Sequence, residues 1–82
     1  MVTTAMYSIS RNLVMLETSD NLLVPMSPIA FKKSYPAIVR KRLLRADLNH
    51  QIIMQKKNRD AGIFSVAKRQ DIIIKKIRSL MR

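Results

Sequence analysis

Apolar and polar residues alternate along the first part of the chain, a pattern typical of a β-strand. One face of this alternation, interrupted by Arg11, holds Tyr7, Ile9, Leu13 and Met15, and the other holds Val14 and Leu16. The turn-forming residues 18–21 follow, and residues 22–24 would return as a second strand. Pro25 would end that strand, because proline has no N–H to donate to a ladder. We therefore predict a β-hairpin over residues 7–24, with a helix over residues 12–24 as the alternative.

The first helix signal is the pair Ser27 and Pro28. Serine is a favoured N-cap, and proline is favoured at the first position of a helix. A short helix to about residue 34 is expected. Pro36 keeps Tyr35 away from helical angles and can open a longer helix, which runs without Gly or Pro to about residue 60. Two apolar stripes recur along it at helical spacing: Val39, Leu43, Ala46, His50 and Ile53, and Ala37, Leu44, Leu48 and Ile52. A helix with two apolar sides is expected to contact neighbours on both.

The only glycine, Gly62, lies where a left-handed helix C-cap is wanted. Ser65 is then predicted to cap a last helix that reaches about residue 82. Its expected inner face comprises Val66, Gln70, Ile73, Ile77 and Leu80, flanked by Ala67, Ile74 and Met81. The fold class that follows is mostly α or a small α+β domain. In it, an N-terminal hairpin segment (residues 1–30) packs on a basic helical hairpin (residues 31–82) as a single domain.

The break around Gly62 also resembles the turn of a helix-turn-helix, whose second helix presents its first residues to the major groove. Under that interpretation the candidates for DNA contact are Ser65, Lys68, Arg69 and Lys75, and Gln70 would suit adenine if it faced outward. The match is partial, because Lys68 stands where the motif usually has an apolar residue. A plain helical hairpin with basic outer faces is the interpretation that we favour.

Charge is distributed unevenly along the chain, which has 16 Lys and Arg, 5 Asp and Glu and a net charge of +11. Residues 1–30 carry one base and two acids, a net charge of −1, and residues 31–82 carry fifteen bases and three acids, a net charge of +12. Lys and Arg displace condensed counterions from phosphates, so this excess points to nucleic acid as the partner. The candidate binding residues are Lys32, Lys33, Arg40, Lys41, Arg42, Arg45, Lys56, Lys68, Arg69, Lys75, Lys76, Arg78 and Arg82.

Residues that carry catalysis or hold metals are scarce. His50 is the only histidine, and its place on a predicted inner stripe indicates a packed core residue. The chain has no cysteine, and one glycine cannot build a phosphate-binding loop. We therefore expect no enzyme activity, cofactor or metal. No apolar run approaches the roughly 18 residues of a membrane span, and no signal peptide is recognised, so we expect a cytoplasmic protein.

These patterns predict a small nucleic-acid-binding protein that neutralises phosphates, either a DNA-binding regulator or a subunit of a ribonucleoprotein particle. Aromatic residues are few, and Phe64 is expected to pack in the turn, so no base-stacking platform is predicted. Two alternatives stay open. The last helix could lie on an anionic membrane surface. The chain could also be a protein-binding regulator or inhibitor that docks on a larger partner, or that forms a homodimer by edge pairing of its hairpin.

Overall fold

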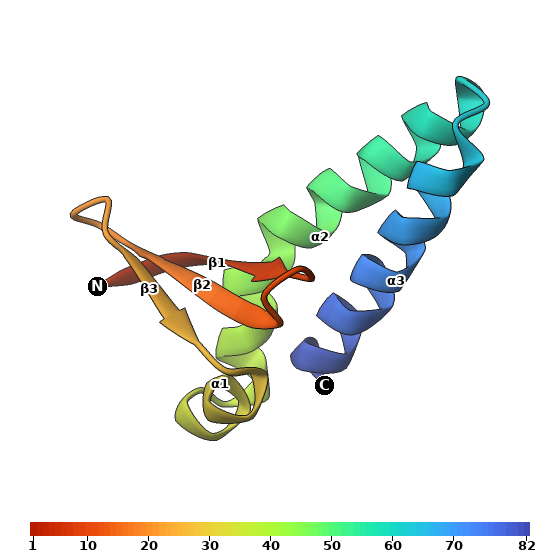
Figure 1. Cartoon of the computed structure of the whole chain (residues 1–82). Helices are drawn as coiled ribbons and strands as arrows, with labels where there is room; N and C mark the ends of the chain where they lie inside the picture. The colour runs from red at the N-terminus through yellow and green to blue at the C-terminus, as the bar shows by residue number, and fades with distance from the viewer.

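The computed structural model describes every residue from Met1 to Arg82. The elements in chain order are β1 (Val2–Ser8), β2 (Leu13–Thr18), β3 (Leu23–Met26), α1 (Pro28–Ser34), α2 (Ala37–Asp60) and α3 (Phe64–Met81). The strands form one antiparallel sheet in the order β1-β2-β3. Helices α2 and α3 run antiparallel and side by side, and they extend well beyond the sheet (Figure 1). The predicted α+β architecture, a strand layer packed on a helical hairpin, is confirmed.

The sheet has one strand more than the alternation predicted. Residues 9–12 form a turn between β1 and β2, so the expected unbroken strand from residue 7 to residue 16 is wrong. Asn12 makes this turn with a φ of 50°, a left-handed conformation that asparagine tolerates well. The second turn lies where it was predicted, with Asn21 at a φ of 61°. Pro25 lies inside β3 instead of ending it, because β3 is an edge strand.

A single apolar core joins the sheet to all three helices. Ser27 caps α1 by accepting a hydrogen bond from the Ala30 N–H at 3.1 Å, as predicted, and α1 presents Phe31 to this core. Burial of each large apolar side chain contributes about 1.5–3 kcal/mol. The core residues are Ala5, Val14, Leu16, Phe31, Leu43, Leu44, Ile77 and Leu80.

Arg40 is buried, at 7% exposure, so the prediction that it lies on an outer basic face is wrong. Its Nε donates to the Leu80 carbonyl at 2.7 Å, and its Nη1 donates to the Lys32 carbonyl at 3.2 Å. The guanidinium also donates to the main-chain oxygens of Tyr35 and Arg82. These acceptors belong to the last turns of α1 and α3, where carbonyls lack intrahelical partners and the helix dipole is negative. Arg40 therefore holds two helix ends against α2.

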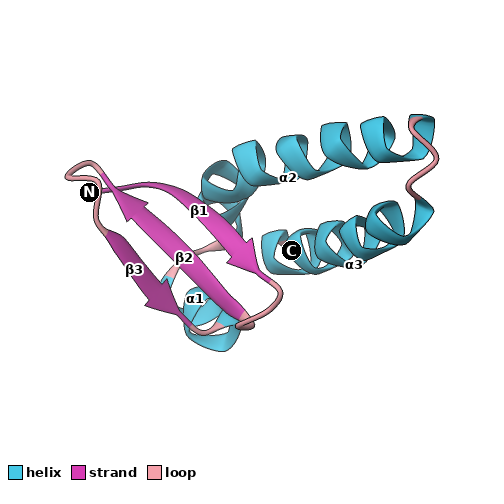
Figure 2. Ribbon diagram, turned by 45° about the horizontal axis from the view of Figure 1, so that its top comes forward, coloured by secondary structure: helices cyan, strands magenta, loops and turns pink.

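The α2–α3 turn closes with a Schellman motif around Gly62, whose φ is 76°. The N–H of Gly62 donates to the Arg59 carbonyl at 3.0 Å, and that of Ile63 donates to the Asn58 carbonyl at 2.8 Å. Helix α3 begins at once, with Ile63 as its N-cap in place of the predicted Ser65. The two helices lie alongside each other (Figure 2). This is the plain helical hairpin, whereas the helices of a helix-turn-helix cross at about 90–120°.

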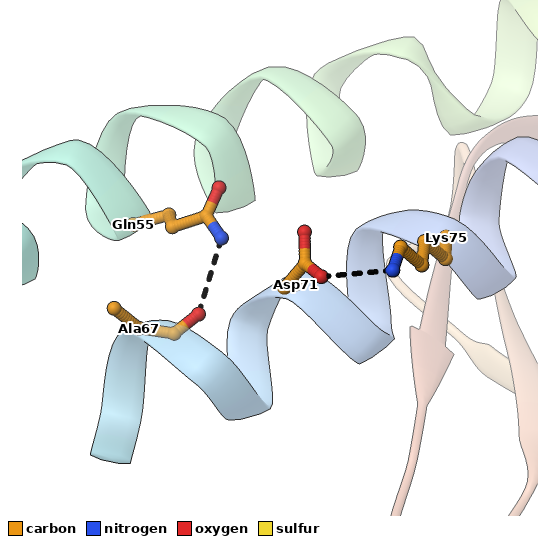
Figure 3. Close-up of polar contacts among 4 residues, drawn as sticks. All are labelled: Gln55, Ala67, Asp71 and Lys75. Atoms are coloured by element: carbon orange, nitrogen blue, oxygen red, sulfur yellow. Dashed lines mark hydrogen bonds and ion pairs between the residues drawn. The ribbon is translucent and has the colours of Figure 1, made fainter. Parts of the chain in front are cut away.

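We call the part of this hairpin that lies beyond the sheet, residues 49–73, the arm. Its inner face buries two amides and one small apolar residue, Ala67. Gln55 Nε2 donates to the Ala67 carbonyl at 3.1 Å (Figure 3), and Asn58 Nδ2 donates to Gln70 Oε1 at 2.8 Å. Gln70 is thus buried and cannot read adenine. The predicted stripe from Val39 to Ile53 is correct only in its first half. Ala46, His50 and Ile53 are exposed, so His50 is not a core residue.

Candidate nucleic-acid interface

The contacts of α2 and α3 divide each helix into three sides. Asp47 defines the sheet side of α2, since its Oδ2 accepts the N–H of Tyr7 at 2.9 Å. Gln55 and Asn58 define the side that faces α3. On α3, Gln70 faces α2, while the C-terminal apolar residues turn toward the core. Residues three, four or seven apart share one side of a helix, so these contacts assign the neighbouring positions as well. The remaining, third side of each helix points away from both the sheet and the other helix.

This third side carries exposed bases from both helices, and we name it the outer basic face. All of its basic side chains are exposed. In α2, Lys41 and Arg59 stand 18 residues apart, which corresponds to about 27 Å along the helix axis. Because α2 and α3 lie side by side (Figure 2), the two rows of charge run together. The outer basic face comprises Lys41, Arg45, Lys56 and Arg59 from α2, and Lys68, Lys75, Arg78 and Arg82 from α3 and its C-cap.

Almost none of this charge is neutralised within the protein. The one ion pair joins Lys75 Nζ to Asp71 Oδ2 at 3.1 Å on the outer basic face (Figure 3). The hydrogen bond from Lys75 is the main reason why the pKa of Asp71 is lowered; desolvation opposes it, and the Lys75 charge, a hydrogen bond with Gln55 and the Arg59 charge add to it. No other Lys or Arg has a carboxylate within 4.0 Å. The surface therefore keeps an unbalanced positive field.

The predicted binding residues separate into groups in the structure. Lys41, Arg45, Lys56, Lys68, Lys75, Arg78 and Arg82 come together on the outer basic face. Arg42 lies beside it on the flank of α2, and helical spacing places Arg69 and Lys76 toward the sheet side of α3. Lys32 and Lys33 lie in the last turn of α1. Arg40 is buried and takes no part.

Sequence reasoning missed Arg59, which belongs to the outer basic face. Its spacing of three from Lys56 was the available signal. The sequence analysis also predicted that Phe64 packs in the turn, whereas that side chain is 70% exposed in the first turn of α3. Ile52, which is exposed among the bases of α2, was assigned to an inner stripe. No pattern in the sequence marked these apolar side chains as surface residues.

Other kinds of site find less support. No three or more His, Cys, Asp or Glu residues gather as metal ligands would. None of the helices combines the length and the apolar composition that a membrane span requires. Two hollows are present, one on α2 beside Lys41 and Arg42 and one between β1 and His50 of α2. Comparison with models of protein families, with curated proteins and with solved structures finds no match to this chain.

Proposed function

We propose that this protein binds nucleic acid by neutralising backbone phosphates with the outer basic face. The observation that supports this most directly is the set of exposed bases on one side of α2 and α3, of which only Lys75 is paired with a carboxylate. Each Lys or Arg that meets a phosphate releases condensed counterions, and this release drives affinity without reading sequence. A polyanion would supply the counter-charge that the fold itself lacks.

The dimensions of the surface suit a nucleic-acid backbone. The charged row on α2 is about 27 Å long, which matches roughly eight nucleotide steps of 3.4 Å along one strand. A second row on α3 runs beside it. If the seven bases of the outer basic face other than the paired Lys75 contact duplex phosphates, log affinity should fall against log salt with a slope of about −6. A DNA-binding regulator and a ribonucleoprotein subunit are both proposed on this basis.

Binding of α3 alone to a membrane surface is disfavoured. An amphipathic helix binds an interface by inserting its apolar side. In α3 that side is Ile74, Ile77 and Leu80, which are already buried in the protein. Release of the helix would open the core that they share with the sheet and α2. A folded protein that meets a polyanion with its charged side requires no such opening.

Two matched pairs of adjacent residues test the proposal. Lys56→Glu/Lys68→Glu reverses two charges on the outer basic face. Lys57→Glu/Arg69→Glu makes the same charge change one residue later in each helix, about 100° around each axis. The first pair should weaken binding to duplex DNA and to double-stranded RNA by roughly 100-fold at low salt. It should also make the slope of log affinity against log salt shallower by about 1.8, because two phosphate contacts are lost. The second pair should have a much smaller effect on both.

Titrations by fluorescence anisotropy at several salt concentrations give both quantities for each nucleic acid. The ratio of the affinities for the two duplexes then separates a DNA ligand from an RNA ligand. Equal losses in the two double variants would contradict an oriented interface, since net charge alone would then decide binding. Absence of salt-dependent binding by the unaltered protein to any nucleic acid would reject the proposal as a whole.

A further inference from the structure

Phe64 is the only aromatic side chain exposed on this protein. It is 70% exposed in the first turn of α3, whereas Phe31 is fully buried and both tyrosines are half-buried. The Schellman turn at Gly62 explains this position, because it starts α3 at the tip of the arm, away from the sheet and α1 (Figure 1). Most of the ring is therefore open to solvent.

The tip around Phe64 carries exposed charges of both signs, with bases from both helices. Lys68 lies one turn further along α3 on the same side, and Asp71 lies two turns further. Arg59 and Asp60 are the last two residues of α2, which the short turn at Gly62 joins to α3. The ring therefore lies at the distal end of the outer basic face, near Lys68 of its own helix and near the end of α2 that carries Arg59.

The chemistry at this tip selects among possible occupants. Neither hollow of the surface includes Phe64, so the ring is not part of an apolar groove that would receive a protein segment. A second copy of the chain carries the same net charge of +11, so its approach is repulsive. An unpaired nucleobase needs only one flat apolar face, and its flanking phosphates need cations on either side. Both are present here.

We propose that Phe64 stacks on an unpaired nucleobase, while Arg59 and Lys68 hold the neighbouring phosphates. This inference rests on the proposed function and narrows its ligand to single-stranded nucleic acid, or to structured RNA with a bulged or looped base. Stacking of one base on an aromatic side chain is typically worth about 1–3 kcal/mol when measured by alanine substitution. It is tolerant of sequence, since every base has a flat face.

The first test compares Phe64→Ala with Ile29→Ala. Ile29 is also 70% exposed but lies on α1, at the other end of the molecule from the arm tip. Phe64→Ala should lower the affinity for a single-stranded oligonucleotide about 5- to 150-fold, and the affinity for a blunt duplex less than about twofold. The salt slope should not change, because no charge is removed. Ile29→Ala should change neither affinity.

A spectroscopic test reports the contact itself. The chain contains no tryptophan, so Phe64→Trp introduces a single tryptophan, at the arm tip, which can be excited apart from the two tyrosines. Its emission should be quenched when a single-stranded oligonucleotide binds, and affinity should be retained, since tryptophan also offers a stacking face. A tryptophan introduced by Ile29→Trp should report no quenching.

The two levels of the proposal fail in different ways. If the unaltered protein binds nucleic acid with a steep salt slope but Phe64→Ala binds single strands equally well, the stacking contact is wrong and the phosphate interface stands. The same conclusion follows if Phe64→Ala weakens single-strand and duplex binding equally. If the unaltered protein binds no nucleic acid, both are rejected.

Discussion

The same two helices pack in opposite ways at the two ends of the molecule. At the sheet end, Leu44 of α2 and Ile77 of α3 are fully buried, and charged side chains stay outside except for Arg40 and Asp47. In the arm, amide side chains link the helices beside one buried apolar residue, Ala67, while Ile53 and Phe64 face solvent. One end of the hairpin is thus built to hold the fold. The other places apolar and cationic groups where a ligand could reach them.

This difference makes stability uneven along the hairpin. Apolar burial contributes about 25 cal/mol per Å² and accumulates over a core that several elements share. A hydrogen bond between amides contributes only about 1 kcal/mol net, since it replaces hydrogen bonds to water. Segments with few buried apolar contacts open locally at lower free energy than the core. We therefore expect the arm to open before the sheet end does, and a ligand bound to the arm to reduce that opening.

The largest expected effect tests this difference within one helix. Leu44→Ala, at the sheet end of α2, should lower the free energy of unfolding by about 2–5 kcal/mol, because a fully buried side chain leaves a cavity. Gln55→Ala, in the arm, should lower it by about 1 kcal/mol. Urea denaturation followed by circular dichroism measures both. Equal losses would mean that the amide contacts of the arm hold the hairpin as strongly as the core does.

Local signals predicted the helices well. Ser27 before Pro28, and Gly62 near the end of α2, fix helix ends through short-range hydrogen bonds, so residue types at fixed spacing were sufficient. The alternation of β1 and β2 was read correctly for Val14 and Leu16, both buried. The turn at Asn12 was missed because apolar residues recur at the same period on both of its sides.

Burial depended on tertiary facts that spacing does not contain. His50 lies on a stripe that begins in the core, yet it is exposed, at the edge of a hollow that Thr4 and Met6 of β1 also line. Arg40 was assigned to the surface from its charge, although it lies three and four residues before the buried Leu43 and Leu44; it is buried because two helix ends converge on it. The bases of the outer basic face could be proposed from charge alone. The division of all the predicted bases into an outer set and a sheet-facing set could be made only from the contacts of Asp47 and Gln55 in the structure.

An intermediate effect is expected for the partly buried amide pair of the arm, Asn58 and Gln70. Replacement of Asn58 or Gln70 alone by leucine should destabilise the protein by about 1–2 kcal/mol, because the remaining amide loses its partner. The double replacement should cost less than either single change, and it is expected to be neutral or stabilising, since two apolar groups then meet. The four proteins form a double-mutant cycle, measured by urea denaturation.

That cycle also sharpens the contrast between stability and binding. If the amide pair stabilises the protein less than two leucines would, the double variant should be at least as stable as the unaltered protein. It should also retain the salt-dependent affinity for nucleic acid, since no charge is changed. Strict additivity of the two single losses would show that the amides do not act as a pair, and the description of the arm interior would have to change.

The smallest expected effect on stability concerns Asp71, the one paired acid on the outer basic face. Its pKa is lowered, first by the hydrogen bond from Lys75. This carboxylate therefore adds to stability above the unfolded value of about 3.9, and the contribution is lost as pH falls through the lower folded value. Asp71→Asn should reduce the urea midpoint slightly at pH 7 and not at all near pH 2, because an exposed i,i+4 pair is weak.

Binding should respond to the same change in the opposite direction. With its carboxylate partner gone, Lys75 becomes available to a phosphate, so Asp71→Asn should raise the affinity for duplex nucleic acid and steepen the salt slope by up to about 0.9. Asp60→Asn, which removes an unpaired acid at the end of α2, is the matched control, and it should leave the slope nearly unchanged. A weaker Asp71→Asn complex would mean that Asp71 positions Lys75 for the ligand, and the acid would then belong to the interface.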